Sequence, residues 1–205
     1  MISVIFPAYN EEENVASLHS IIQRAIDDMG EPYEIIAVEN GSTDNTLKEL
    51  KKLSPVKIVV IARNIGQTAG LDAGFKAAKG DVVVTMDADL QNDPKDIPKL
   101  IKKLREGYDV VSGWRRDRHD NWGRRVLSRS ANWLTWKVTG LYLHDHACAL
   151  KTYRRAVLEG INLYGEMHVF LSAILYMRGA KVAEVEVTHH ARTHGFSKHN
   201  FLKAV

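Results

Sequence analysis

The sequence has little of what marks several specialised classes of protein. It contains a single cysteine, Cys148, which excludes an intramolecular disulfide framework and a cysteine-rich zinc site. One cysteine suits a reducing compartment or indifference to redox state. Only five of the 205 residues are prolines, while 45% of the residues are hydrophobic. Because that much apolar surface can form a core, general disorder is excluded and an ordinary globular protein is expected.

Long apolar runs are also absent. No stretch approaches the roughly 18 to 20 consecutive apolar residues of a membrane span. The chain enters the strand-like run 2–6 directly after Met1, without a basic flank or a cleavage site. We therefore expect a chain that is neither secreted nor membrane-spanning as given. Its apolar end at residues 201–205 leaves room for a missing C-terminal extension.

Excess charge of one sign is small, with 28 basic against 25 acidic side chains. That surplus does not by itself indicate nucleic acid, so the placement of the charges matters more than their sum. Residues 114–129 hold six arginines and two tryptophans and no apolar run. We expect a loop or the start of a surface helix there, at the edge of the protein that carries the functional site.

Short apolar runs alternate with helical patterns, which predicts an α/β domain with a mostly parallel central sheet and helices on both faces. Expected strands lie at 2–6, 35–38, 56–61, 82–86, 110–111, 150–153 and 180–187. Expected helices lie at 11–29, 44–53, 68–78, 94–104, 126–138 and 166–177. We expect Gly80 to end the third of these helices in a left-handed conformation. Length and pattern predict a single domain over 1–205.

Polar residues follow each of the first four expected strands, where an open parallel sheet binds ligands. The most informative are Asp87 and Asp89, two residues apart after an apolar strand. Their carboxylates, with Gln91, offer oxygen ligands to Mg²⁺ or Mn²⁺. The alternative is that Asp89 or Asn92 caps the next helix, which leaves Asp87 without a role. No glycine-rich phosphate loop is present, so metal and arginine would have to neutralise phosphates.

These motifs together resemble a known family. Segments 7–11 (PAYNE), 39–44 (ENGSTD), 64–66 (NIG) and 87–91 (DADLQ) are similar to those of family 2 glycosyltransferases of the GT-A fold. Later segments narrow the resemblance to dolichyl-phosphate mannose synthases and bacterial polyprenyl-phosphate glycosyltransferases. These are 112–115 (SGWR), 124–128 (RRVLS), Asp145 with Cys148, and Arg192 followed by Ser197 and Lys198.

The resemblance implies an inverting enzyme that moves a hexose from a GDP- or UDP-sugar, such as GDP-mannose, to polyprenyl or dolichyl phosphate. Residues 1–112 would form the nucleotide-sugar half and 113–205 the acceptor half. The residues implied to bind the nucleotide sugar are Pro7, Tyr9, Glu11, Ala37, Glu39, Asp87, Ala88 and Asp89. Those implied to hold the metal are Asp87, Asp89 and Gln91.

The acceptor half is implied to bind a phosphate. A phosphate monoester is largely ionised near neutral pH, so it needs positioning and neutralisation more than a base. The implied acceptor residues are Arg115, Arg124, Arg125, Ser128, Arg192, Ser197 and Lys198. Asp89, Arg115 and Asp145 are the implied catalytic residues, with Asp145 an orienting group or base, or else only a cap or turn residue.

The tryptophans near these arginines suit a membrane interface, so we expect peripheral association with the cytoplasmic face of a membrane. Two other functions remain open. One keeps the donor site but uses a saccharide hydroxyl as acceptor, with Asp145 as base. The other is a basic nucleic-acid-binding module built on residues 114–129, against which the acidic residues after the fourth strand argue.

Overall fold

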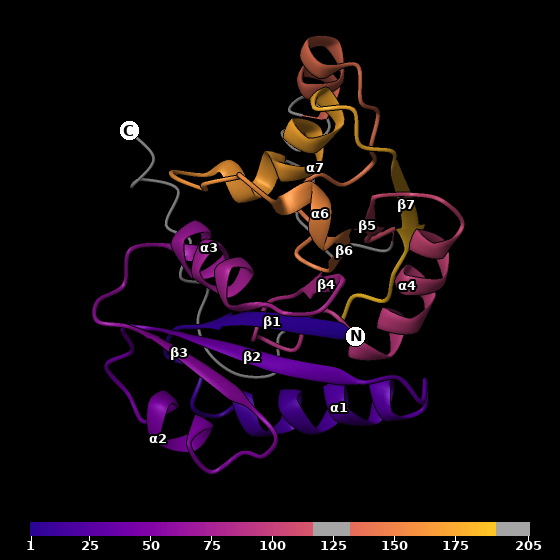
Figure 1. The fold of residues 1–205 in the computed structure, drawn as a ribbon. Helices are drawn as coiled ribbons and strands as arrows, with labels where there is room; N and C mark the ends of the chain where they lie inside the picture. Colours follow the sequence, from indigo (N-terminus) through magenta and orange to yellow (C-terminus); the bar gives the residue numbers. More distant parts are fainter. Residues whose placement is uncertain (117–131, 192–205) are drawn as a thin grey trace.

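A seven-stranded sheet runs through the computed structural model, which describes residues 1–116 and 132–191 (Figure 1). The strand order is β3-β2-β1-β4-β6-β5-β7. The strands are β1 (Ile2–Ala8), β2 (Tyr33–Asn40), β3 (Lys57–Ile61), β4 (Val82–Thr85), β5 (Val110–Trp114), β6 (Lys151–Arg154) and β7 (Val182–Glu186). Among them β6 runs antiparallel to β4 and β5, and every other pairing is parallel. The predicted mostly parallel sheet is confirmed.

Helices cover both faces of this sheet, as Figure 1 shows. They are α1 (Val15–Asp27), α2 (Thr46–Leu50), α3 (Gln67–Ala77), α4 (Ile97–Arg105) after a 3₁₀ turn η1 (Pro94–Asp96), α6 (Arg155–Leu158) and α7 (Met167–Met177). Residues 132–139 are also helical. Because strand side chains alternate, Val4 and Phe6 of β1 enter the core shared with α1 and α4, while Ile5 enters the core shared with α3 and α7.

The predicted role of Gly80 is wrong. Helix α3 ends at Ala77, and Ala78 is extended, with φ −71° and ψ 136°. Gly80 does not adopt the left-handed conformation. It is required for close packing instead, because a Cβ at this position would lie 2.7 Å from the backbone nitrogen of Ser3 in β1.

The carboxyl ends of β1 and β4 lie where the strand order of the sheet changes direction. β1 lies between β2 and β4, so the strand order changes direction between β1 and β4. In open α/β sheets, ligands bind outside the strand ends at such a switch point. The segments after β1 and β4 are those that carry Tyr9 and Asp87.

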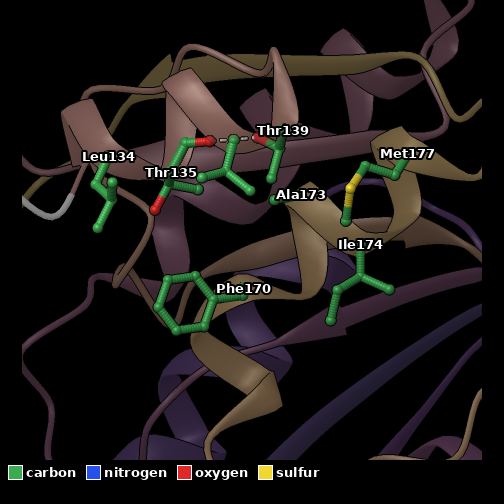
Figure 2. Close-up of a pocket in the computed structure, with 8 residues that line it drawn as sticks. Leu134, Thr135, Thr139, Phe170, Ala173, Ile174 and Met177 are labelled. Carbon is green, nitrogen blue, oxygen red and sulfur yellow. Dashed lines mark hydrogen bonds between the residues drawn. The ribbon is translucent and has the colours of Figure 1, made fainter.

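A small cavity lies between the helical residues 132–139 and α7, away from the sheet (Figure 2). Its volume is about 270 Å³ and its lining is mostly apolar. The lining residues are Leu134, Thr135, Val138, Thr139, Phe170, Ala173, Ile174 and Met177. The two helices therefore leave an apolar groove between them rather than closing completely.

Candidate active site

The loops after β1 and β2 are joined by hydrogen bonds at the carboxyl edge of the sheet. The backbone N–H of Asn10 donates to Ser42 Oγ at 3.1 Å, and that of Thr43 donates to Asn10 Oδ1 at 2.8 Å. The backbone N–H of Glu11 donates to Thr46 Oγ1 at 2.8 Å. These bonds fix the two loops as one surface, which is a condition for a preorganised binding site.

The loop after β3 reaches the same place. Gly41 has φ +69°, and a Cβ there would lie 2.4 Å from the backbone of Arg63, so only glycine fits this close approach. The Asn40 side chain also donates to the carbonyl of Gly66 at 3.0 Å. The polar segments after the first three strands therefore converge, as expected from a parallel sheet.

The residues predicted to bind the nucleotide sugar divide into two groups. Tyr9, Glu11 and Glu39 lie at the convergent edge. The carboxylate of Glu39 is buried and accepts the backbone N–H of Ser42 at 2.5 Å. Its contact with the loop means that Glu39 shapes the turn of residues 39–42 directly.

Ala37 does not belong to this edge. Its side chain is fully buried in the core between the sheet and α1, three residues before β2 ends. Ala88 is likewise buried in that core, at 4% exposure. Pro7 packs against α3, because a Cβ at Gly70 would lie 3.1 Å from Pro7 Cβ. Alternation along the strand turns the side chain of Ala37 inward.

The carboxylates of Asp87 and Asp89 follow β4 in a tight turn. The Gln67 side chain donates to Asp87 Oδ1 at 2.5 Å, and the backbone N–H of Gln91 donates to Asp89 Oδ1 at 3.1 Å. Leu90, which directly follows Asp89, has φ +61°, a left-handed conformation that is uncommon for a leucine. Such backbone conformations cluster at functional sites, where the surrounding structure holds them.

The alternative role of Asp89 or Asn92 as a helix cap is wrong. The residue that caps η1 is Asp93, whose side chain accepts the backbone N–H of Lys95 at 3.0 Å. Pro94 follows it at the first position, where its missing N–H has no cost. The two carboxylates after β4 therefore serve another purpose than starting the helix.

The donor set at this turn suits a divalent cation that is shared with a ligand. Asp87 and Asp89 offer hard oxygen ligands, and Asp89 is only 6% exposed. Over residues 1–116 and 132–191, no group of three or more His, Cys, Asp or Glu side chains could hold a metal by itself. Mg²⁺ commonly binds through one or two carboxylates and completes its shell with water and substrate phosphates, so the residues fit.

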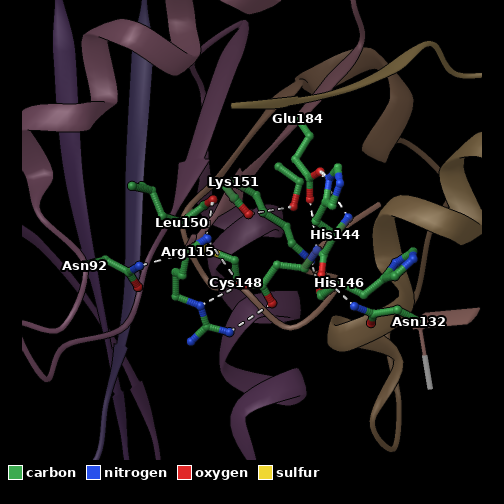
Figure 3. A network of polar contacts seen from close by, with 12 residues as sticks. Asn92, Arg115, Asn132, His144, His146, Cys148, Leu150, Lys151 and Glu184 are labelled. Atoms are coloured by element: carbon green, nitrogen blue, oxygen red, sulfur yellow. Dashed lines mark hydrogen bonds and ion pairs between the residues drawn. The ribbon is translucent and has the colours of Figure 1, made fainter. Parts of the chain in front are cut away.

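Arg115, which directly follows β5, takes part in a buried ion pair (Figure 3). Arg115 Nε donates to Asp145 Oδ2 at 2.7 Å, and Arg115 Nη2 donates to Asp145 Oδ1 at 3.0 Å. Asp145 is 1% exposed, while the Arg115 side chain is 14% exposed. The two-pronged contact fixes the orientation of the guanidinium as well as its position.

The pair has a strong electrostatic effect on Arg115. Burial by itself would lower the pKa of Arg115, but the hydrogen bond and charge of Asp145 outweigh it and raise the pKa above its ordinary value. The charge of Asp87 acts in the same direction. The carboxylates after β4 and the guanidinium after β5 thus belong to one electrostatic environment.

Three further buried groups surround the pair, and sequence reasoning missed two of them. Lys151 is 3% exposed and donates from Nζ to the carbonyl of His146 at 2.8 Å, and burial lowers its pKa to about 8. Burial followed by the charge of Lys151 lowers the pKa of His146 to about 4. Burial raises the pKa of the Cys148 thiol to about 11. The sequence of β6, Lys-Thr-Tyr-Arg, did not distinguish Lys151 from an ordinary surface lysine.

Six predicted acceptor residues lie outside the described residues. They are Arg124, Arg125, Ser128, Arg192, Ser197 and Lys198. Their roles remain predictions from the sequence. Of the predicted acceptor set, Arg115 is therefore the residue whose surroundings the structure describes.

Comparison with known proteins identifies relatives of this chain. The family model "Glycosyl transferase family 2" matches residues 3–161. A dodecaprenyl-phosphate galacturonate synthase of Rhizobium johnstonii is 41% identical over 98% of the chain. An undecaprenyl-phosphate 4-deoxy-4-formamido-L-arabinose transferase of Aeromonas hydrophila is 36% identical over 100% of the chain. The chain spans only 62% and 64% of the lengths of these two relatives.

The fold also matches solved structures. Glucosyl-3-phosphoglycerate synthase from Mycobacterium tuberculosis, in complex with Mn²⁺, UDP and phosphoglyceric acid, has a TM-score of 0.74 over 94% of this chain and 71% of its own. The sequence identity is 22%, so the likeness concerns the fold alone. The same enzyme has been solved with Mg²⁺ and UDP, with a TM-score of 0.71 over 94% of this chain and 72% of its own, at 23% identity.

Proposed function

Because this chain belongs to glycosyl transferase family 2 and has the GT-A fold, we propose that it transfers a hexose from a nucleotide diphosphate sugar to a polyprenyl phosphate. The observation that carries the proposal is the pairing of opposite charges at one edge of the sheet. Asp87 and Asp89 suit the metal-bound diphosphate of the donor, and the buried guanidinium of Arg115 suits the phosphate of the acceptor. The names of both relatives support the acceptor class.

The donor half is formed by residues 1–112 in this proposal. In this half Tyr9, Glu11 and Glu39 would surround the nucleotide, with Pro7 beneath them. The hydrogen bonds that join the loops after β1, β2 and β3 support this arrangement. Asp89 and Gln91, together with Asp87, would hold Mg²⁺ or Mn²⁺ for the diphosphate of the donor. When bound, the ion neutralises the leaving group as a Lewis acid. The roles of Ala37 and Ala88 remain predictions from the resemblance, and the side chains of both residues are buried in the core.

The reaction is a direct displacement with inversion. An oxygen of the lipid phosphate attacks the anomeric carbon while the bond to the diphosphate oxygen breaks, and the nucleoside diphosphate leaves. A phosphate monoester enters this step already largely ionised, so no protein base is needed. This fits Asp145, because both of its carboxylate oxygens accept hydrogen bonds from Arg115. We therefore assign Asp145 to orienting Arg115 and disfavour the saccharide acceptor, for which Asp145 would have to act as a base.

The partner that presents the acceptor is a membrane surface. Exposed apolar side chains gather over residues 133–142 and along α7, around the groove of Figure 2. Within this group Trp133 and Trp136 flank Lys137, whose Nζ lies 6.0 Å and 4.8 Å from the two ring centroids. Indoles beside a cation suit the headgroup region of anionic lipid. We assign this surface to peripheral contact with the cytoplasmic face of a membrane.

No helix within the described ranges combines the length and the apolar character needed to cross a bilayer.

The nature of the transferred sugar follows from the relatives only as a class. Both are named for sugars other than mannose, galacturonate in one and 4-deoxy-4-formamido-L-arabinose in the other. They give no support to a preference for GDP-mannose and dolichyl phosphate, so the proposed donor class is a UDP- or GDP-sugar and the proposed acceptor class a polyprenyl phosphate.

A transfer assay tests the proposal. The protein is incubated with Mn²⁺ and a panel of radiolabelled UDP- and GDP-sugars, with either undecaprenyl phosphate or an oligosaccharide as acceptor. We expect label in the lipid fraction with undecaprenyl phosphate, and none in the oligosaccharide. Label in the oligosaccharide alone would support the saccharide acceptor and overturn the proposal. A nucleic-acid-binding module, which the family match disfavours, would give neither product.

A further inference from the structure

The turn that carries Asp145 is held from β7 by one carboxylate, that of Glu184 (Figure 3). Glu184 Oε1 accepts the backbone N–H of Asp145 at 2.9 Å. Glu184 Oε2 accepts the backbone N–H of His144 at 3.0 Å and lies 2.8 Å from His144 Nδ1. One side chain thus fixes two successive peptide units by using both of its oxygens.

The same turn is held from β6 on its other side. Lys151 Nζ donates to the carbonyl of His146 at 2.8 Å. The main chain is therefore bonded at residue 145 by Glu184 and at residue 146 by Lys151. Between these two contacts the side chain of Asp145 projects onto Arg115. The position of the carboxylate is determined by a main chain that has little room to move.

The strand register explains why Glu184 can reach this turn. In the parallel pair of β5 and β7, Glu184 lies opposite Ser112, three residues before Arg115. Glu184 contacts the main chain of Asp145, and Arg115 contacts its side chain. The turn connects the carboxylate on β7 to the guanidinium that follows β5.

We propose that Glu184 is a positioning residue for the acceptor site, which keeps both oxygens of Asp145 on Arg115 by fixing the backbone of residues 144–145. What Arg115 then binds rests on the proposed function, whereas the coupling of Glu184 to the ion pair does not. A two-pronged contact of arginine and carboxylate is directional, so a shift of the turn loses alignment before it breaks contact. Misplacement of a binding group by about 1 Å can reduce a rate by roughly 10²-fold.

Glu184→Gln is the informative variant because it keeps the shape of the side chain. Its amide offers one oxygen, and its NH₂ group would face a backbone N–H, donor against donor. Glu186→Gln is the matched control. It lies two residues along the same strand and contacts Arg116 at 3.5 Å, with 47% of its side chain exposed. A surface contact of this kind contributes little to stability, so its loss should leave the turn of residues 144–146 unchanged.

The first readout is independent of catalysis. Exchange of the Arg115 Nε–H with solvent is followed by NMR on protein labelled with ¹⁵N-arginine, and the signal is assigned by its loss in Arg115→Lys. We expect slow exchange in the wild type and in Glu186→Gln, and exchange at least tenfold faster in Glu184→Gln. Unchanged protection in a folded Glu184→Gln protein overturns the proposal. If that variant does not fold, Glu184→Asp, which keeps the charge on a shorter side chain, is measured with the same expected direction and the same refuting result.

The second readout separates this proposal from the proposed function. In Glu184→Gln we expect the KM for undecaprenyl phosphate to rise about tenfold, while the KM for the nucleotide sugar stays within about twofold. Faster Nε–H exchange with an unchanged acceptor KM would support the positioning role and remove Arg115 from the acceptor site. A raised acceptor KM with unchanged exchange would overturn the positioning role and leave the proposed function in place.

Discussion

Replacing Asp145 by asparagine should destabilise the protein by about 3 kcal/mol, although the side chain keeps its shape and only one carboxylate oxygen is replaced by an NH₂ group. The pair with Arg115 is almost completely buried, with side-chain exposures of 1% and 14%. Removal of one charge from a buried pair costs roughly 3 to 5 kcal/mol, because the remaining charge is left without compensation. We expect the lower end, since the asparagine oxygen can still accept one Arg115 N–H and the charge of Asp87 continues to favour the guanidinium.

Urea unfolding followed by tryptophan fluorescence measures this cost, with the variant and the wild type compared at one pH. Glu159→Gln is the matched control. It removes a carboxylate 3.4 Å from Arg155 in a pair that is exposed on both sides, and should cost less than about 1 kcal/mol. A cost below about 1 kcal/mol for Asp145→Asn would refute the reasoning. It would mean that the ion pair is solvated enough for its charge to be dispensable, and Arg115 would then not be held in one orientation.

Three other outcomes are expected. Because His146 has a pKa of about 4 when folded against 6.5 when unfolded, the unfolded chain binds more protons between these values and stability falls as the pH drops through them. We therefore compare the free energy of unfolding of His146→Leu with that of the wild type. The variant's advantage should be on the order of 2 kcal/mol larger at pH 4.5 than at pH 7. An equal advantage at the two pH values in urea unfolding would contradict this. Arg125→Ala or Lys198→Ala should raise the KM for the lipid acceptor, and an unchanged KM would remove the residue from the site. Trp133→Ser should weaken binding to phosphatidylglycerol vesicles about tenfold. Val60→Ser is the control, because Val60 is 56% exposed and Trp133 is 55% exposed, and it should leave vesicle binding unchanged. Equal effects of the two substitutions would exclude the proposed surface.

The order of strands and helices could be predicted from the sequence because the first half repeats one signal. Apolar runs such as 2–6 alternate with amphipathic segments such as 11–29. In the structure a strand covers the first of these segments and a helix lies within the second. The ends were less accurate, since β1 extends to Ala8 and α1 begins only at Val15. Propensity changes little across these boundaries, and hydrogen bonds from neighbouring loops decide them.

The candidate site could be predicted only where residue types carry the signal. Asp87 and Asp89 stand out because carboxylates seldom lie at the end of a buried apolar strand unless they are paired or bind a metal. Lys151 and Glu184 gave almost no signal in the sequence. An alternating strand such as 180–187 commonly places acidic residues on its solvent face, and β6, which carries Lys151, is a short polar strand. Their function depends on contacts with a turn some 5 to 40 residues away in the sequence, and no local pattern encodes such a contact.

The proposed function depends on metal binding by Asp87 and Asp89 after β4. A manganese-binding measurement is the most direct test of this role. Free Mn²⁺ is measured by electron paramagnetic resonance during titration of the protein, with and without UDP. We expect stoichiometric Mn²⁺ binding by the wild type when UDP is present, and binding at least tenfold weaker for a folded Asp89→Asn variant. Equal Mn²⁺ binding by the wild type and Asp89→Asn in the presence of UDP would contradict it.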